Sequence, residues 1–240
     1  MTPGEQGAAP APATAAGRRS RYRYGLLLGL IATSLVFQLA APFTDWSRLV
    51  TVALQGATLL LALRTSGARR PLLWAATAVV LVALGGSTVA AVTGTGSGAE
   101  STSIVNLLLV GLAPTAIVVG LWRKVREDGR VTLTTMFGVL CVYLLVGMFF
   151  GFIYGSIQAF DSTGVFAQVS HPGQADFLYF SFTTLTTTGF GDLSVATGLG
   201  RAAAISEALF GQIYLVTVVA AIVTNLRPRR ADPRGPGASR

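Results

Sequence analysis

A short apolar stretch that ends in a glycine-rich turn constrains this chain more than any other feature. Residues 176–192 have the sequence DFLYFSFTTLTTTGFGD. The apolar part is about a dozen residues, so a helix would reach roughly 18 Å at ~1.5 Å per residue. This helix cannot cross a membrane, because the hydrocarbon core is ~30 Å thick. We therefore expect it to enter the membrane and return, with its non-helical backbone covered by protein or water.

The two glycines near the end of this stretch permit an unusual backbone. Gly189 and Gly191 flank Phe190, and glycine adopts backbone angles that other residues avoid. Successive carbonyl groups can then point the same way. Four such loops around one axis would stack rings of oxygen atoms, and such rings can replace the hydration shell of an ion.

The stretch is similar to the selectivity filter of the potassium channels, which is built from rings of backbone carbonyls. The corresponding residues here are Thr187, Thr188, Gly189, Phe190, Gly191 and Asp192. Thr188 replaces the usual valine of that family, and Phe190 replaces the usual tyrosine. The resemblance covers roughly residues 132–226 and is to the bacterial two-helix pore type. It implies that K⁺ binds to the carbonyl oxygens of residues 187–190 and to the Thr187 hydroxyl.

The composition is that of an integral membrane protein. The chain has 240 residues, of which 52% are hydrophobic and 12% are charged, about half the charge of a typical soluble domain. We predict an all-α integral membrane protein with six transmembrane helices, and with a re-entrant pore helix and filter between the fifth and sixth. The predicted spans are residues 24–43, 49–63, 72–93, 104–122, 133–157 and 202–226.

These spans divide the chain into four regions. Residues 1–23 are expected to be a disordered cytoplasmic tail, and residues 227–240 a second, basic one. Residues 24–130 form a predicted four-helix transmembrane domain, and residues 131–226 the potassium-channel pore domain. A voltage sensor needs arginines along its fourth helix, but residues 104–122 contain none. We therefore expect the first four helices to brace the pore or to hold lipid.

Basic residues indicate how the chain crosses the membrane. The N-terminal arm, the connections after the second and fourth spans and the C-terminal tail are all rich in arginine. Because cytoplasmic loops carry an excess of basic residues, we predict a multi-pass protein of the cell membrane with both termini in the cytoplasm. The net charge of +8 favours anionic lipid at the cytoplasmic face as a partner, rather than nucleic acid.

Residues around the motif are expected to hold its shape. Asp176 fits the N-terminus of the pore helix, where a carboxylate complements the helix dipole. By resemblance, Asp192 lies at the outer mouth and is hydrogen-bonded back to the pore helix. Tyr179 occupies a position where the family often has a tryptophan that donates to this aspartate. We expect the Tyr179 hydroxyl to donate to Asp192, because Phe190 has no hydroxyl. The alternative is an interfacial aromatic anchor.

Glu207 lies in the sixth predicted span, and an ionisable residue at membrane depth is a candidate functional residue. The residues that we expect to line the pore cavity are Gln212, Leu215 and Val219. At ~3.6 residues per turn, Glu207 then faces away from the cavity. We expect Ser181 or Thr184 to be its hydrogen-bond partner. The alternative is that Glu207 faces water near the outer surface.

Glycines in the fifth and sixth spans have two predicted roles. Gly147, Gly151 and Gly155 follow one another at a spacing of four, a pattern typical of close helix contact. We expect this face to pack on the pore helix or on the sixth span. By resemblance, Gly211 is the hinge at which the sixth span bends during gating, and close helix packing is the alternative.

Three functions fit these features. The first is a potassium-selective channel, assembled as a homotetramer because one chain supplies one filter loop. The second is a weakly selective monovalent cation channel, since Thr188 and Phe190 change the packing behind the filter. The third is a transporter or membrane scaffold in which the filter-like loop is coincidental. No group of residues supports an enzyme, and no cofactor is expected apart from the permeating K⁺.

Overall fold

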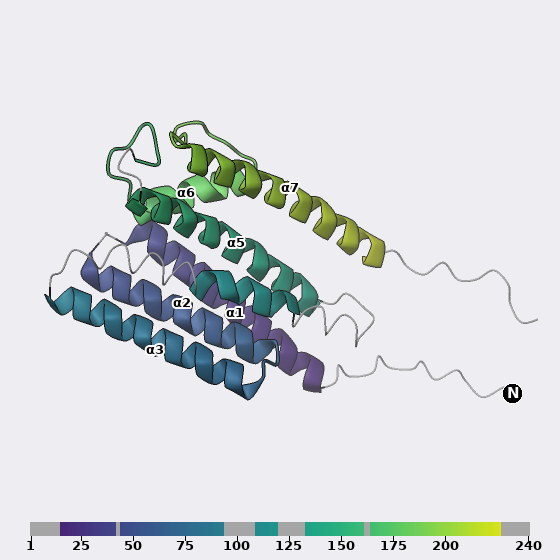
Figure 1. Cartoon of the computed structure of the whole chain (residues 1–240). Helices are drawn as coiled ribbons and strands as arrows, with labels where there is room; N and C mark the ends of the chain where they lie inside the picture. The colour runs from purple at the N-terminus through teal and green to yellow at the C-terminus, as the bar shows by residue number, and fades with distance from the viewer. Residues whose placement is uncertain (1–14, 42–43, 94–108, 120–132, 161–163, 227–240) are drawn as a thin grey trace, which may run out of the picture.

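The computed structural model describes residues 15–41, 44–93, 109–119, 133–160 and 164–226. Their regular structure is helical, apart from one isolated β-bridge between Phe166 and Val195. The helices are α1 (Ala15–Ala40), α2 (Asp45–Thr65), α3 (Arg70–Thr93), α5 (Leu133–Phe160), α6 (Gln174–Leu185) and α7 (Gly198–Leu226). Residues 109–119 form a further short helical segment between α3 and α5 (Figure 1).

The helices agree with the predicted spans in place and differ in length. α1 begins at Ala15, so the prediction of a disordered tail was wrong for residues 15–23. A helix that leaves the hydrocarbon core can continue in water where its residues are good helix formers, as arginine is. Residues 1–14 and 227–240, which complete the two predicted tails, lie outside the described residues.

Three of the described helices are long and apolar enough to cross a membrane. The spans are Trp46–Thr65 in α2, Arg70–Val89 in α3 and Thr135–Phe160 in α5. Shorter apolar helices are found at Tyr24–Ala40 and Leu109–Val119. The fourth predicted span is described only over residues 109–119, and the total of six spans stays a prediction.

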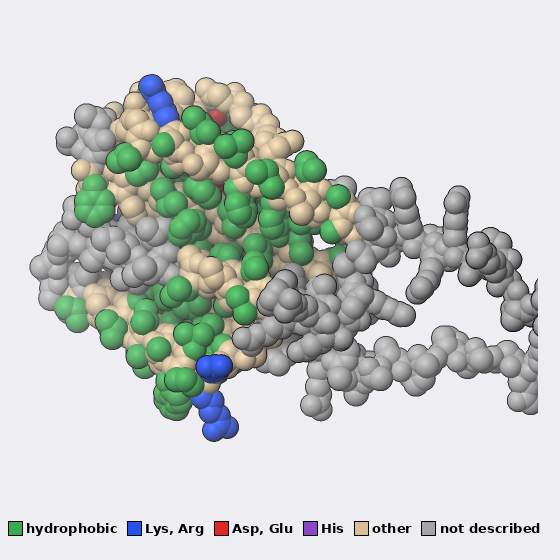
Figure 2. Space-filling model, turned by 45° about the vertical axis from the view of Figure 1, so that its right-hand side comes forward, with side chains coloured by type: hydrophobic (Ala, Val, Ile, Leu, Met, Phe, Trp, Pro, Cys, Tyr) green, Lys and Arg blue, Asp and Glu red, His purple; other side chains and the backbone are tan. Residues whose placement is uncertain are grey.

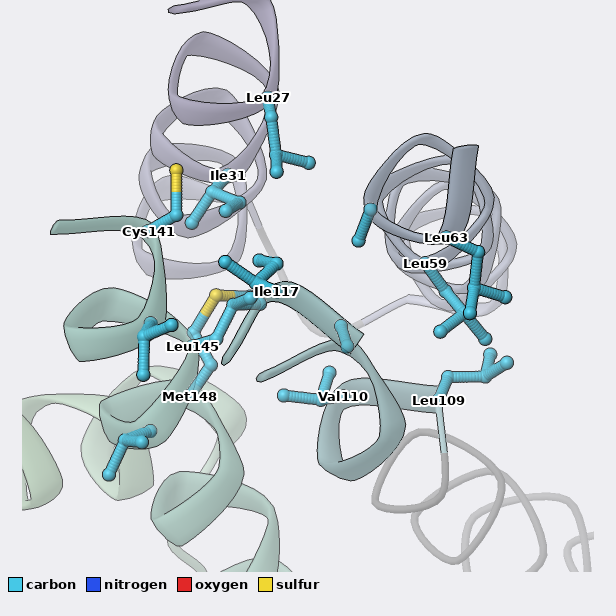
Figure 3. Close-up of a cluster of buried hydrophobic side chains, with 14 of the residues drawn as sticks. Leu27, Ile31, Leu59, Leu63, Leu109, Val110, Ile117, Cys141, Leu145 and Met148 are labelled. Atoms are coloured by element: carbon cyan, nitrogen blue, oxygen red, sulfur yellow. The ribbon is translucent and has the colours of Figure 1, made fainter. Parts of the chain in front are cut away.

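One hydrophobic core joins the N-terminal helices to α5 and α6. α1 packs against α2, α5 and α6, and α2 packs against α3. Figure 3 shows side chains from α1, α2, the 109–119 segment and α5 converging in this core, among them Ile31, Leu59, Val110 and Leu145. Within a membrane, where lipid tails are as apolar as these side chains, close van der Waals packing rather than the hydrophobic effect holds such helices together.

Different helix ends and turns lie at the two ends of the bundle. The start of α1, the turn between α2 and α3 and the end of α7 lie at one end, and α6 lies toward the other (Figure 1). This is the arrangement that the predicted orientation requires.

Candidate functional site

The short helix α6 is the predicted pore helix, and its first turn contains the expected carboxylate. α6 begins after Gly173, whose N–H donates to Asp176 Oδ2 at 2.8 Å. The side chain of Asp176 therefore caps the helix and places negative charge at the positive end of its dipole. The predicted position of Asp176 is confirmed.

Glycines of α5 let α6 approach closely. A Cβ at Gly147 would lie 2.7 Å from the ring of Phe182. A Cβ at Gly151 would lie 2.8 Å from the side chain of Leu178, and one at Gly155 would meet the same helix at 3.4 Å. Since only glycine leaves this space open, the spacing of four predicted the packing face correctly, and the partner is the predicted pore helix.

The backbone of residues 187–191, the candidate filter, alternates in handedness. The φ angle is positive at Thr187 (57°), Gly189 (53°) and Gly191 (81°), and not at the two residues between them. Alternation of this kind turns successive carbonyl groups toward the same side. The two glycines adopt these angles without a steric penalty.

Thr187 adopts its positive φ at a cost, because its β-branched side chain disfavours this region. Its N–H donates to the carbonyl of Thr184 at 2.9 Å, which helps to hold the residue in place. Strained residues of this kind concentrate at ligand-binding and switch sites. This strain could not be predicted from the sequence, because threonine has no preference for the left-handed region.

The amide groups of the candidate filter point back to α6. The N–H groups of Thr188 and Gly189 both donate to the carbonyl of Thr183, at 2.8 and 3.1 Å. Among the described residues, no hydrogen bond reaches the carbonyl oxygens of residues 187–190. The N–H groups of residues 187–189 therefore donate to α6, while the carbonyl oxygens of residues 187–190 are available to a cation.

Tyr179 contacts two residues of the motif at once. Its hydroxyl donates to Asp192 Oδ2 at 2.8 Å, which is the contact predicted from the sequence. Its ring also stacks on Phe190, with ring centroids 6.1 Å apart and an interplanar angle of 4°. The hydrogen bond to Asp192 raises the pKa of the Tyr179 phenol, because ionisation of the phenol would remove the donor. The stacking on Phe190 was not predicted.

Glu207 is fully buried between α5, α6 and α7, with 0% of its surface exposed. Tyr154 of α5 donates its hydroxyl to Oε2 at 2.7 Å, and Ser181 of α6 is hydrogen-bonded to Oε1. The predicted partnership with Ser181 is confirmed, and the described contacts give Thr184 no part in it. Tyr154 was missed, although a buried tyrosine hydroxyl generally requires a polar partner.

The hydrogen atoms of this cluster can be counted. Ser181 Oγ lies 2.6 Å from the carbonyl oxygen of Gly147 as well as against Glu207. A hydroxyl has one hydrogen to donate, so it cannot satisfy both acceptors. All contacts are satisfied if Glu207 is a neutral acid that donates to Ser181 Oγ, while Ser181 donates to Gly147. The geometry thus fits an uncharged Glu207, as burial among apolar helices also favours.

The segment after the candidate filter is paired with the loop that follows α5. Ala167 donates its N–H to the carbonyl of Ser194 at 3.0 Å, and Ala196 donates to Val165 at 2.9 Å. The side-chain amide of Gln168 both donates to Ser194 Oγ and accepts from the Ser194 N–H. These bonds fix the chain that follows the candidate filter to the loop before α6.

Gly211 of α7 meets the C-terminal end of α6. A Cβ at Gly211 would lie 2.2 Å from the carbonyl oxygen of Leu185, which also accepts a hydrogen bond from the hydroxyl of Tyr143 at 3.2 Å. This contact favours close packing as the role of Gly211. Gln212 and Leu215 are exposed in the single chain, and the side chain of Val219 is outside the described part of the structure.

A comparison with protein-family models identifies the part of the chain that contains these residues. Residues 138–227 match the model of a family described as "Ion channel". The matched range begins within α5 and includes α6, the candidate filter and all of α7. A search of curated proteins gave no match. Together with the apolar helices, the family match indicates a membrane protein whose residues 138–227 form an ion-channel domain.

Proposed function

We propose that this chain is a subunit of a potassium-selective channel that conducts K⁺ passively across the cell membrane. The observation that carries the proposal is the backbone of the candidate filter, in which handedness alternates and the carbonyls of residues 187–190 accept no hydrogen bond within the described residues. Uncharged oxygen ligands suit conduction, because an ion must bind well enough to enter and weakly enough to leave.

The proposed channel is a homotetramer, since each chain supplies one filter segment. The surface of α7 supports assembly. Leu209, Ile213 and Val216 are 59%, 64% and 61% exposed in the single chain, and their spacing places them along one stripe of the helix. Phe190 is 69% exposed although it stacks on Tyr179. Neighbouring subunits around a common axis would cover these side chains.

Potassium selectivity, rather than weak selectivity among monovalent cations, is supported by the contacts behind the filter. The second possibility arises because Thr188 and Phe190 depart from the residues usual in potassium channels. Phe190, however, is held by the ring of Tyr179, and Asp192 by the hydroxyl of Tyr179. A filter held on both sides of Gly191 resists the mutual repulsion of its carbonyl oxygens and keeps them at the spacing that fits one ion.

The proposed orientation places both termini in the cytoplasm and the filter near the outer face. It rests on the arginine-rich connections, and on the arrangement in which the start of α1, the α2–α3 turn and the end of α7 share one end of the bundle (Figure 1). The pore helix then re-enters the membrane from outside. Its C-terminal end, negative by its dipole, faces the permeating cation.

Ion flux into liposomes that contain the purified protein tests the proposal. Gly191→Ala should abolish K⁺ flux, because a Cβ disfavours the φ of 81° that the carbonyl orientation needs. Gly164→Ala is a matched control, since Gly164 has a φ of 80° outside the candidate filter. It should fold with a similar strain and still conduct. Equal loss of flux in both variants would contradict the assigned filter, and a native protein that is not tetrameric and passes no ions would favour a transporter or scaffold.

A further inference from the structure

A second possible binding site lies far along the chain from the candidate filter. α2, α3 and the 109–119 segment line a cavity of about 490 Å³ that is open on one side, within the size range of small-molecule sites, ~300–1,000 Å³. Most of its lining is apolar, with Leu59 from α2, Ala75 and Val79 from α3 and Leu112 from the 109–119 segment. The cavity therefore suits a hydrocarbon chain.

One end of the cavity is positively charged. Arg69, in the turn before α3, is the single charged residue among the lining residues described. The two hydroxyl groups of the lining, those of Ser66 and Thr115, donate to carbonyls one turn earlier in the chain, at 2.9 and 2.7 Å. The polar group that faces an occupant is thus a guanidinium, which binds phosphate oxygens in a bidentate manner.

The surroundings of the cavity are suited to lipid. Of the three helices that can span a membrane, α3 is the least covered by the rest of the chain. Only 17% of its span is buried, against 50% for the spans of α2 and α5. Trp74 and Val82 of α3 are each 75% exposed. Figure 2 shows a face of the molecule on which hydrophobic side chains cover much of the described surface, while the visible arginine side chains lie at its top and bottom.

The position of Arg69 also indicates which leaflet of the membrane would supply a lipid. Arg69 lies in the turn between α2 and α3, at the end of the bundle that holds the start of α1 and the end of α7 (Figure 1). In the proposed orientation this end faces the cytoplasm, where anionic lipids give the membrane surface a negative potential.

We propose that this cavity binds one anionic phospholipid from the cytoplasmic leaflet, with an acyl chain between α2, α3 and the 109–119 segment and the phosphate at Arg69. The lipid completes the packing of α3, which the protein leaves largely uncovered. The site is separate from the candidate filter, and its test does not depend on ion conduction.

Native mass spectrometry of the full-length protein in detergent tests the charged end of the site. Phosphatidylglycerol should bind about fivefold more tightly than phosphatidylcholine, the factor expected for one arginine beside an anionic headgroup. Arg69→Gln should remove this preference. Arg70→Gln, which makes the same charge change at the neighbouring position outside the lining, should retain it. Equal losses in the two variants would show a diffuse surface charge and overturn the site.

A cavity-filling substitution tests the apolar part. Ala75→Phe should reduce the binding of both lipids at least fivefold, whereas Ala78→Phe, on the same helix but outside the lining, should leave it unchanged. Val79→Phe makes the same test if Ala75→Phe does not fold, as judged by helix content and oligomeric state. Unchanged lipid binding in the cavity-filling variants would overturn the proposal. So would a native protein whose lipid binding is abolished by self-association through α3, since a second copy would then occupy the cavity.

Discussion

At the scale of single residues, Tyr179 contacts both Phe190 of the candidate filter and Asp192, the residue that follows it. A phenylalanine at position 190 cannot anchor the filter through a hydroxyl, so its ring must be held by contact. The ring of Tyr179 provides that contact, and its hydroxyl holds the next polar group along the chain, Asp192. The single side chain of Tyr179 therefore supports two residues of the motif, Phe190 through its ring and Asp192 through its hydroxyl.

The hydroxyl of Tyr179 can be removed without loss of the ring. Tyr179→Phe should keep the stacking on Phe190 and lose the hydrogen bond to Asp192, so that conduction is lost several-fold faster during sustained activity. Asp192→Asn should have a similar effect, because the charge-assisted bond is weakened. Single-channel recording of both variants and of the double variant measures their coupling. Additive effects would contradict the pairing of these residues, and an unchanged Tyr179→Phe channel would make Tyr179 an aromatic anchor only.

Substitutions of Glu207 test whether this buried side chain is a neutral acid. Glu207→Gln can preserve every contact, because the amide group can donate to Ser181 and its oxygen can accept from Tyr154. We expect its free energy of unfolding to lie within about 1 kcal/mol of the native value. Glu207→Ala leaves a cavity and unsatisfied hydroxyls, and should cost about 2–4 kcal/mol. Thermal unfolding of the two variants compares them. If Glu207→Gln were as damaging as Glu207→Ala, the native residue would be an ionised carboxylate.

At the scale of helices, α5 and α6 fit together through glycine on one side and large side chains on the other. The spacing of Gly147, Gly151 and Gly155 predicted this face from the sequence, since small residues at intervals of four have few other uses in an apolar helix. The contact of Gly211 with Leu185 could not be predicted in this way. It depends on where the end of α6 meets α7, which no local pattern encodes.

A substitution at Gly211 distinguishes two proposed roles of this residue, close helix packing and a gating hinge. Gly211→Ala introduces a Cβ within 2.2 Å of a backbone oxygen and should destabilise the protein by about 1–3 kcal/mol. It should also alter selectivity, because α6 must shift. Gly86→Ala on α3 is the matched control, since a Cβ there meets nothing within 4 Å. A Gly211→Ala protein with normal stability and selectivity but a changed open probability would instead establish the hinge.

Local sequence patterns were sufficient to predict the helices and the candidate filter, but not the contacts between helices. Apolar runs located the helices, and the glycine motif located the candidate filter, because both are local patterns. The partner of Asp192 was predictable because a known motif fixed its distance from Tyr179. Tyr154, Tyr143 and the strained Thr187 were missed, since their roles depend on contacts between helices or on a backbone angle that threonine disfavours.

At the scale of the whole molecule, the N-terminal helices share one hydrophobic core with α5 and α6. The 109–119 segment packs directly on α5, where a Cβ at Gly111 would lie 2.9 Å from Phe149. A shared core places α1 against both α5 and α6. The N-terminal helices therefore pack directly against α5 and α6, and the proposed lipid would add to the packing of α3.

The reversal potential with K⁺ on one side of the membrane and Na⁺ on the other tests the central claim most directly. For a monovalent ion the potential moves by about 59 mV for each tenfold difference in permeability. A potassium-selective tetramer with the filter at residues 187–191 should reverse at least that far from zero, on the side that favours K⁺, and Gly164→Ala should leave this value unchanged. A reversal potential near zero in the native protein would contradict potassium selectivity and identify a weakly selective cation channel.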